Sequence, residues 1–172
     1  MKFALIDRVM ELEPGRRIVA VKAVTLAEEY LAEHFPTFPV LPGVFMLECM
    51  TEAARWLVHA SRNFMHSVVL LHSAKGVTYK SFVAPGQLLR VEVICRRLGE
   101  EGSDFSGAGF CGADEVVKGR FSLRHMTLAS RSPTWAATDE RIVDEARRRW
   151  SILYRGVSAV SGETVGSASG IG

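Results

Sequence analysis

Three of the six prolines in the sequence fall within the ten residues from His34 to Gly43. Proline fixes its own φ angle and pushes the residue before it out of the α region, so this stretch cannot be helical. It predicts a stiff, extended connection. Pro42 and Gly43 then open an apolar stretch with helical spacing, and we predict a helix from about Val44 to Asn63 that is buried on most sides.

Segments rich in β-branched and aromatic residues flank this helix. Before it, residues 17–24 alternate after a Pro-Gly turn signal, and we expect residues 3–12 to be their antiparallel partner, followed by a short helical turn at 25–33. After it, short turns separate predicted strands at 68–73, 76–82, 88–98, 104–111 and 116–126, which favours an antiparallel meander. The pattern predicts an α+β fold in which a sheet wraps around one long helix.

The C-terminal part has a different pattern. Apolar residues at helical spacing predict a helix from Asp139 to Tyr154, with Thr138 or Asp139 as its cap. Glycine and serine dominate residues 157–172, and we expect that tail to be disordered. The expected organisation is a sheet-and-helix domain over 1–128, a helical extension over 129–156, and the tail.

The composition narrows the class of protein. With 48% hydrophobic and 23% charged residues, the chain can build a core, and its formal net charge of +2 gives no argument for nucleic-acid binding. The three cysteines lack CxxC spacing, and we interpret them as reduced thiols of a cytoplasmic protein. No stretch approaches the ~20 apolar residues that span a bilayer, and the N-terminus does not resemble a signal peptide. We therefore expect a soluble protein.

Two ionisable residues and one glycine are candidates for chemistry. Glu48 lies in an apolar stretch of the predicted helix, where a carboxylate is costly unless it is paired or used; a structural hydrogen bond or simple exposure is the alternative. His34 begins the proline-rich loop and suits base chemistry near neutral pH, although loop histidines are usually incidental. Gly43 opens the helix, where free amides and the helix dipole stabilise an oxyanion, unless it serves only as a cap.

The string His34-Phe35-Pro36-x-x-Pro39-x-x-Pro42-Gly43-Val44, followed by Glu48, closely resembles the active-site signature of the FabZ-type 3-hydroxyacyl-acyl-carrier-protein dehydratases. Residues 6–15 and 22–25 resemble the family's N-terminal strands, and residues 80–89 resemble its stretch between two sheet strands. The resemblance covers residues 3–126. It implies a hot-dog fold and a homodimer with two sites at its interface, often assembled as a trimer of dimers.

The resemblance also implies roles for the candidate residues. His34 would abstract the C2 proton of a 3-hydroxyacyl thioester, and Glu48 of the other subunit would protonate the departing 3-hydroxyl, directly or through a water. An apolar surrounding would raise the pKa of Glu48 and suit it to this work. The Gly43 amide would hold the thioester carbonyl. Phe45 and Met46 would line a tunnel for the acyl chain, with ordinary core packing as the alternative.

The expected partner is acyl carrier protein bearing the substrate. Because carrier proteins are acidic, a near-neutral enzyme needs a local basic patch to recruit one. The candidates lie in the C-terminal helix, and the alternative is an ordinary solvated helix face: Arg141, Arg147, Arg148 and Arg149. No cofactor, metal ion or nucleic acid is expected.

Three features depart from the family pattern. Thr37 stands where glycine is usual, which would change the backbone angles near His34. Glu52 stands where glutamine is usual, one helical turn after Glu48, and two buried carboxylates at this spacing would raise each other's pKa. The chain also begins later than typical members and continues into the extra helix. These departures leave altered substrate choice and loss of activity open as alternatives to an ordinary dehydratase.

Other functions fit the sequence less well. A dehydratase–isomerase would also shift the double bond, but that group typically has aspartate at the position of Glu48. Hot-dog thioesterases lack the His-Phe-Pro loop. The remaining alternative is a non-catalytic or altered-specificity hot-dog subunit that binds acyl carrier protein, against which the presence of both His34 and Glu48 argues.

Overall fold

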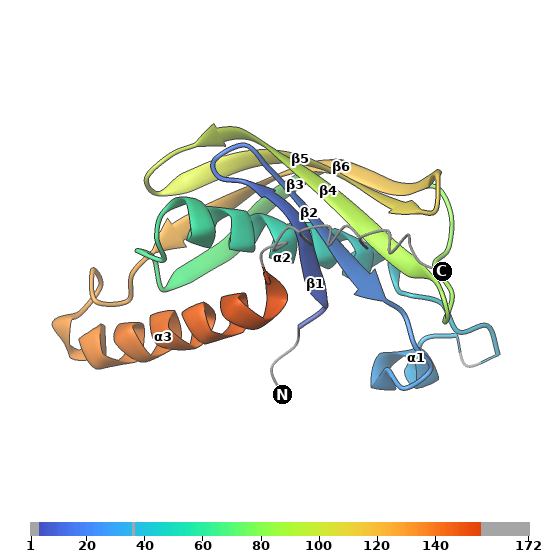
Figure 1. Ribbon diagram of the computed structural model, residues 1–172, viewed down its shortest axis with the longest axis horizontal. Coiled ribbons are helices and arrows are strands. Elements are labelled where there is room, and N and C mark those ends of the chain that lie inside the picture. The colour runs from blue at the N-terminus through green and yellow to red at the C-terminus, as the bar shows by residue number, and fades with distance from the viewer. Residues whose placement is uncertain (1–3, 36, 156–172) are drawn as a thin grey trace, which may run out of the picture.

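The computed structural model describes residues 4–35 and 37–155, which form a curved antiparallel sheet packed on helices (Figure 1). The elements in chain order are β1 (Arg8–Glu13), β2 (Arg17–Ala23), α1 (Glu29–Glu33), α2 (Gly43–Ser61), β3 (Val68–Tyr79), β4 (Leu88–Leu98), β5 (Gly102–Cys111), β6 (Asp114–Met126), a 3-10 turn (Pro133–Trp135) and α3 (Ala136–Leu153). The strand order β1-β2-β4-β5-β6-β3 and the central α2 confirm the predicted α+β, hot-dog architecture. None of the helices in the described ranges combines the length and apolarity that crossing a bilayer requires.

The prediction of a simple meander is wrong for β3. Strands β4, β5 and β6 follow one another, but β3 pairs with the far side of β6, with Val68 opposite Met126. Residues 80–87 then carry the chain back across the molecule, where the amide of Leu41 donates to the carbonyl of Val83 at 2.8 Å. A Pro-Gly turn signal marks only the end of a strand, and it does not determine which edge the next strand joins.

Two predicted strand boundaries also change. The strands expected at 68–73 and 76–82 are the single strand β3, because register shifts and the positive φ of Gly76 (59°) absorb the irregularity while pairing continues. The strand expected from residue 3 begins only at Arg8. The amides of Leu5 and Ile6 donate to a side chain of α2 and are not part of the sheet ladder.

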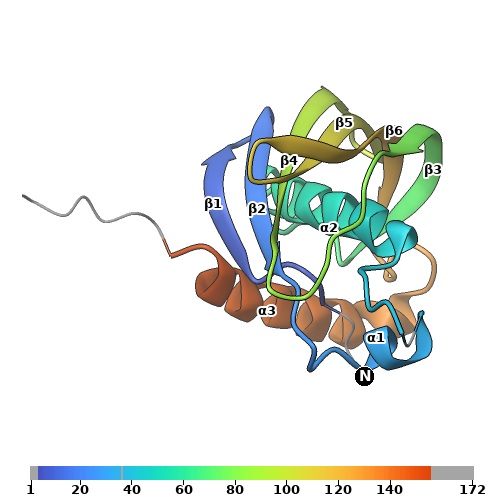
Figure 2. The same cartoon turned by 90° about the vertical axis from the view of Figure 1, so that its right-hand side faces the viewer.

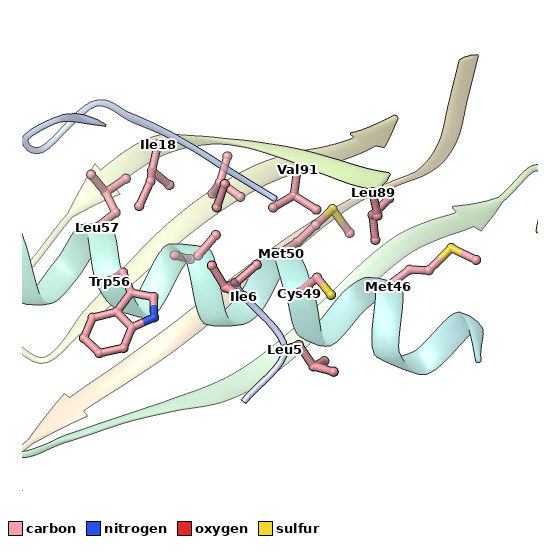
Figure 3. Packing of buried hydrophobic residues seen from close by; sticks show 14 of the residues in the cluster. Leu5, Ile6, Ile18, Met46, Cys49, Met50, Trp56, Leu57, Leu89 and Val91 are labelled. Carbon is pink, nitrogen blue, oxygen red and sulfur yellow. The ribbon is translucent and has the colours of Figure 1, made fainter. Parts of the chain in front are cut away.

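α2 fills the concave face of the sheet, as Figure 2 shows. Its apolar residues recur at helical spacing, and the facing residues of the strands alternate between the core and the outside, as the two backbone periods require. A Cβ at Gly107 of β5 would lie 2.9 Å from the sulfur of Met50, so this glycine allows strand and helix to approach closely. The resulting core includes Leu5, Ile18, Met46, Met50, Leu57, Leu89 and Val91 (Figure 3).

α3 covers the side of α2 that faces away from the sheet (Figures 1 and 2). Trp150 is the centre of this contact. Its ring stacks on Trp56 of α2 with centroids 5.8 Å apart, stacks on Tyr154 at 5.0 Å, and meets the edge of Phe64 at 6.5 Å. Aromatic rings bury large apolar areas, so this cluster holds the C-terminal helix on the domain.

The C-terminal helix is confirmed, but its predicted cap is wrong. The helix begins at Ala136, before either Thr138 or Asp139. The carboxylate of Asp139 accepts hydrogen bonds from the amides of Leu128 and Ala129, at 2.9 and 2.6 Å. It therefore fixes the connection from β6 and does not cap the helix. The tail from 157 to 172, for which we expect disorder, lies outside the described residues.

Glu52 joins three segments that are distant in sequence. Its carboxylate, on α2, accepts hydrogen bonds from the amides of Leu5 and Ile6 at 2.7 and 3.2 Å. On the other side it pairs with Arg149 of α3 at 3.4 Å. The side chain of Glu52 is only 8% exposed whereas that of Glu48 is 31% exposed, so the condition that both carboxylates be buried is not met.

Removing this carboxylate should destabilise the fold. We expect Glu52→Ala to lower the free energy of unfolding by about 2–4 kcal/mol, because two buried amides and Arg149 lose their acceptor. Glu52→Gln keeps an acceptor oxygen but loses the charge, and should cost about 1–2 kcal/mol. Urea unfolding measures both, with the exposed Glu140→Ala of α3 as the control. Losses equal to that of the control would contradict the structural role.

Candidate active site

His34 lies directly after α1, at the start of the proline-rich loop. Its backbone amide donates to the carbonyl of Tyr30 at 3.1 Å and closes the last turn of that short helix. Its partly buried ring lies 4.4 Å from the ring of Phe35, centroid to centroid. The end of a helix and a neighbouring aromatic ring thus fix the position of the imidazole.

The residue after His34 has a strained backbone. Phe35 adopts a φ of +51°, in the left-handed region that bulky residues rarely occupy, and its carbonyl accepts the amide of Phe38 at 2.8 Å. Such strain persists only where the surroundings enforce it, and it is common at functional sites.

Gly43 is the first residue of α2 and follows Pro42 at the N-cap. Phe45 is the first residue whose amide donates within the helix, to the carbonyl of Pro42 at 2.9 Å, so the amides of Gly43 and Val44 precede the helical ladder. A Cβ at position 43 would lie 3.2 Å from ring carbons of Tyr79, at the end of β3. Glycine thus allows the helix to start against this ring, with amide donors suited to an oxyanion.

Glu48 lies in the second turn of α2 and forms an ion pair with Arg55, seven residues later on the same helix. Residues at this spacing share a helix face. The expectation of an apolar surrounding for Glu48 is wrong, because its face of α2 is partly exposed and carries a cation. The adjacent Cys49 faces the core instead, and burial raises the pKa of its thiol.

His34 and Glu48 are not joined in one chain. Within residues 4–35 and 37–155, no hydrogen bond or ion pair connects the two side chains. Both belong to the same end of the molecule, where α1 and the start of α2 lie (Figure 1). A single chain therefore presents a candidate base, a candidate acid and a helix start without assembling all three around one point.

The proposed tunnel residues take part in packing. Met46 is 2% exposed and belongs to the core, and Phe45 packs edge-to-face on Tyr30 with centroids 4.7 Å apart. Neither belongs to the lining of the cavities at the end of α2, on the outer face of β4 to β6, at the β4–β5 turn or between α2 and α3. Their role in holding an acyl chain stays a prediction.

The four arginines of the predicted docking patch divide into two pairs. Arg147 donates to the carbonyl of Asn63 at 3.0 Å, and Arg149 pairs with Glu52, so these two hold α3 against the domain. The other two are exposed, as Arg147 also is, but make no such contact with the described residues, and they lie seven residues apart on one face of the helix: Arg141 and Arg148.

Arg55 and Tyr79 lie near the candidate site but were not predicted to belong to it. The position of Arg55 could have been inferred from the sequence, since it follows Glu48 at a spacing of two helical turns and so shares its helix face. That of Tyr79 could not, because only the path of β3 brings its ring to Gly43. Burial raises the pKa of the Tyr79 hydroxyl, so this group stays protonated at neutral pH.

Comparison with known proteins agrees with this arrangement. The FabA-like domain family matches residues 1–118. The 3-hydroxyacyl-[acyl-carrier-protein] dehydratase FabZ of Variovorax paradoxus is 38% identical over 115 residues, which cover 65% of this chain and 77% of that protein. The protein of the same name from Symbiobacterium thermophilum is 44% identical over 91 residues, which cover 53% of this chain and 64% of that protein.

A solved structure has the same fold. The dehydratase heterocomplex ApeI:P from Xenorhabdus doucetiae superimposes with a TM-score of 0.62 at 18% identity, covering 71% of this chain and 82% of that one. At this identity the likeness concerns the fold alone. The two chains therefore share a fold although few of their residues are identical.

Proposed function

The chain belongs to the FabA-like domain family, and from this membership we propose that it removes water from 3-hydroxyacyl groups carried on acyl carrier protein. The reaction converts a (3R)-3-hydroxyacyl thioester into the trans-2-enoyl thioester, a step of fatty acid biosynthesis. The observation that carries the proposal is the set of His34, Gly43 and Glu48 at the family's spacing, in a chain whose FabZ relatives are named dehydratases.

The chemistry follows from the residue types. A neutral imidazole of His34 accepts the C2 proton while negative charge develops on the thioester oxygen. The amides of Gly43 and Val44 stabilise this charge at the start of α2. The C3–oxygen bond breaks as Glu48 delivers a proton to the leaving hydroxyl, so water departs and the C2–C3 double bond forms. Arg55 contacts the carboxyl group of Glu48 and positions it. Glu48 acts in its protonated form and regains its proton from solvent after each turnover, while His34 releases the C2 proton to solvent.

The proposed site takes His34 from one subunit and Glu48 from a second copy of the chain. The absence of a contact between them within the described residues of one chain supports this assignment. The edge position of β3 supports it too, because an edge strand can pair with another chain. Leu70 and Leu71 of that strand are 55% and 40% exposed, and burying these apolar side chains against a second copy of the chain would be favourable.

Loss of either proton-transfer group should remove most activity. We expect His34→Ala and Glu48→Gln each to lower turnover by about two to four orders of magnitude. Mass spectrometry of carrier-bound 3-hydroxyacyl substrates of several chain lengths measures this loss, and thermal unfolding checks the fold. The exposed neighbour variant Glu33→Gln is the matched control. Near-native rates in either variant would contradict the roles, and a wild-type chain inactive on every substrate would favour the non-catalytic alternative.

A shared site should permit complementation. Mixing inactive His34→Ala and Glu48→Gln chains should restore activity, because a mixed dimer regains one complete pair of groups. The recovered activity should approach a quarter of the wild-type value if subunits exchange at random, since about half of the dimers are mixed and each has one intact site of two. Subunit exchange is verified by native mass spectrometry. No recovery after verified exchange would place both groups in one chain.

Recognition of the carrier protein is part of the same proposal. We assign docking to Arg141 and Arg148, which are exposed, and assign support of α3 to Arg147 and Arg149.

A cytoplasmic location belongs to this proposal as well, because Cys49, Cys95 and Cys111 are free thiols, which suits a reducing compartment.

Charge reversal tests the docking surface. Arg141→Glu combined with Arg148→Glu should raise the KM for carrier-bound substrate about tenfold, more strongly at low salt, because screening weakens steering. Activity on a short soluble thioester should stay near the wild-type value. The matched control, Arg8→Glu with Arg16→Glu, makes the same change in net charge on exposed residues of the β1 region. Equal effects of the two double variants would contradict a specific docking surface.

A further inference from the structure

A cavity of about 520 Å³ lies at the far end of α2 from the candidate active site. It forms where the end of α2, the β4–β5 turn and the end of β6 meet, and Figure 1 shows α2 running from the α1 end of the molecule toward the end where α3 begins. At a rise of 1.5 Å per residue, Arg62 lies roughly 28 Å along the helix axis from Gly43. The lining includes Arg62, His66, Arg124, His125, Met126 and Arg131.

Two imidazoles face this cavity. His125 is only 3% exposed, and its ring interacts with the backbone of Glu100 in the same lining, but neither ring nitrogen makes a hydrogen bond of ordinary geometry to a described residue. The Nε2 atom of His66, whose ring centroid lies 5.3 Å from that of His125, also lacks one. Buried polar groups in native proteins nearly always have partners, so these nitrogens point to a ligand with hydrogen-bonding atoms.

Arg62 indicates what kind of atom is required. One of its terminal nitrogens donates to the carbonyls of Leu98 and Gly99 at 3.1 and 3.0 Å, which fixes the guanidinium at the cavity wall. Its Nε is buried and has no partner among the described residues. A guanidinium nitrogen can only donate, so the complementary group on the ligand is an acceptor.

The charges favour a negative acceptor. Arg124 and Arg131 are exposed at the cavity and form no ion pair with any described residue, including Glu100 and Glu101 of the same lining. Three guanidinium groups thus face two carboxylates. Burial, and next the neighbouring His66, lower the pKa of His125 to about 4, so at neutral pH its ring offers an N–H donor without a charge.

We propose that this cavity binds a small organic anion, a carboxylate or a phosphate monoester, independently of the dehydration site. Its oxygens accept hydrogen bonds from Arg62 Nε and from the imidazoles of His66 and His125. Arg124 and Arg131 contribute charge at the entrance, in the forked geometry that suits both anions. The apolar part of the ligand contacts Met126. A metal ion does not fit, because the described residues contain no group of three or more His, Cys, Asp or Glu able to hold one.

Titration with the simplest members of each anion class tests the proposal. Sodium phosphate and sodium acetate are added to the full chain, with sodium chloride at matched ionic strength as the reference. Calorimetry gives the affinity, and the ring signals of the histidines are followed by NMR. We expect saturable binding of at least one anion with a Kd on the order of 1 mM. The ring signals of His66 and His125 should shift, while those of the exposed His72 should not. Saturation by phosphate or by acetate shows which of the two anion classes the cavity binds.

Matched variants locate the binding. Arg124→Gln with Arg131→Gln, and separately His125→Gln, should each weaken binding by about tenfold or more, because the first loses two charged guanidinium groups and the second replaces the rigid imidazole N–H by an amide of different geometry. Arg96→Gln with Arg120→Gln makes the same charge change on exposed residues outside this cavity and should leave the affinity unchanged. If His125→Gln does not fold, the variant of the two surface arginines still tests whether the anion binds in this cavity. The proposal fails if neither anion saturates, if chloride acts equally, or if the variants bind like the wild type.

Discussion

The burial of α2 in the concave face of the sheet is the interaction on which the rest of the structure depends. The helix gives its apolar side to the sheet, with Met50 and Leu57 fully buried, and Gly107 lets β5 approach it closely. Hydrophobic burial is the dominant favourable term in folding, so the orientation of this helix determines the direction in which each of its side chains points. The exposure of Glu48 and the burial of Glu52 follow from this orientation.

These two carboxylates are one helical turn apart and serve different purposes. Glu52 faces the N-terminal segment and α3, where it satisfies two backbone amides and Arg149. Glu48 is partly exposed and forms its ion pair with Arg55, on the same face of α2. A buried acceptor in a network stabilises the fold, whereas a partly exposed carboxylate is free to meet a substrate. The same residue type is therefore structural at one position and a candidate for catalysis at the other.

The two ends of α2 also differ in chemistry. Its start lies against Tyr79 and presents unpaired amides beside the His34 loop, in which Phe35 carries backbone strain. Its end opens on a cavity lined by arginines and neutral imidazoles. The start of α2 is proposed to bind the thioester oxygen, and its end is proposed to bind an unrelated anion. One buried helix can thus support two separate sites, because its two ends are too far apart for one small ligand to contact both.

The sequence by itself determined the elements, the fold family and the candidate residues. Helical and alternating periods, turn residues and the His34–Gly43 motif are local, and local sterics and hydrophobic spacing act within a few residues. Only the tertiary structure decided the edge that β3 joins, the partners of Glu48 and Glu52, the ring of Tyr79 over Gly43, and the division of the α3 arginines. These depend on contacts between residues far apart in the chain, and such contacts are set by how whole elements pack, a property that no local pattern encodes.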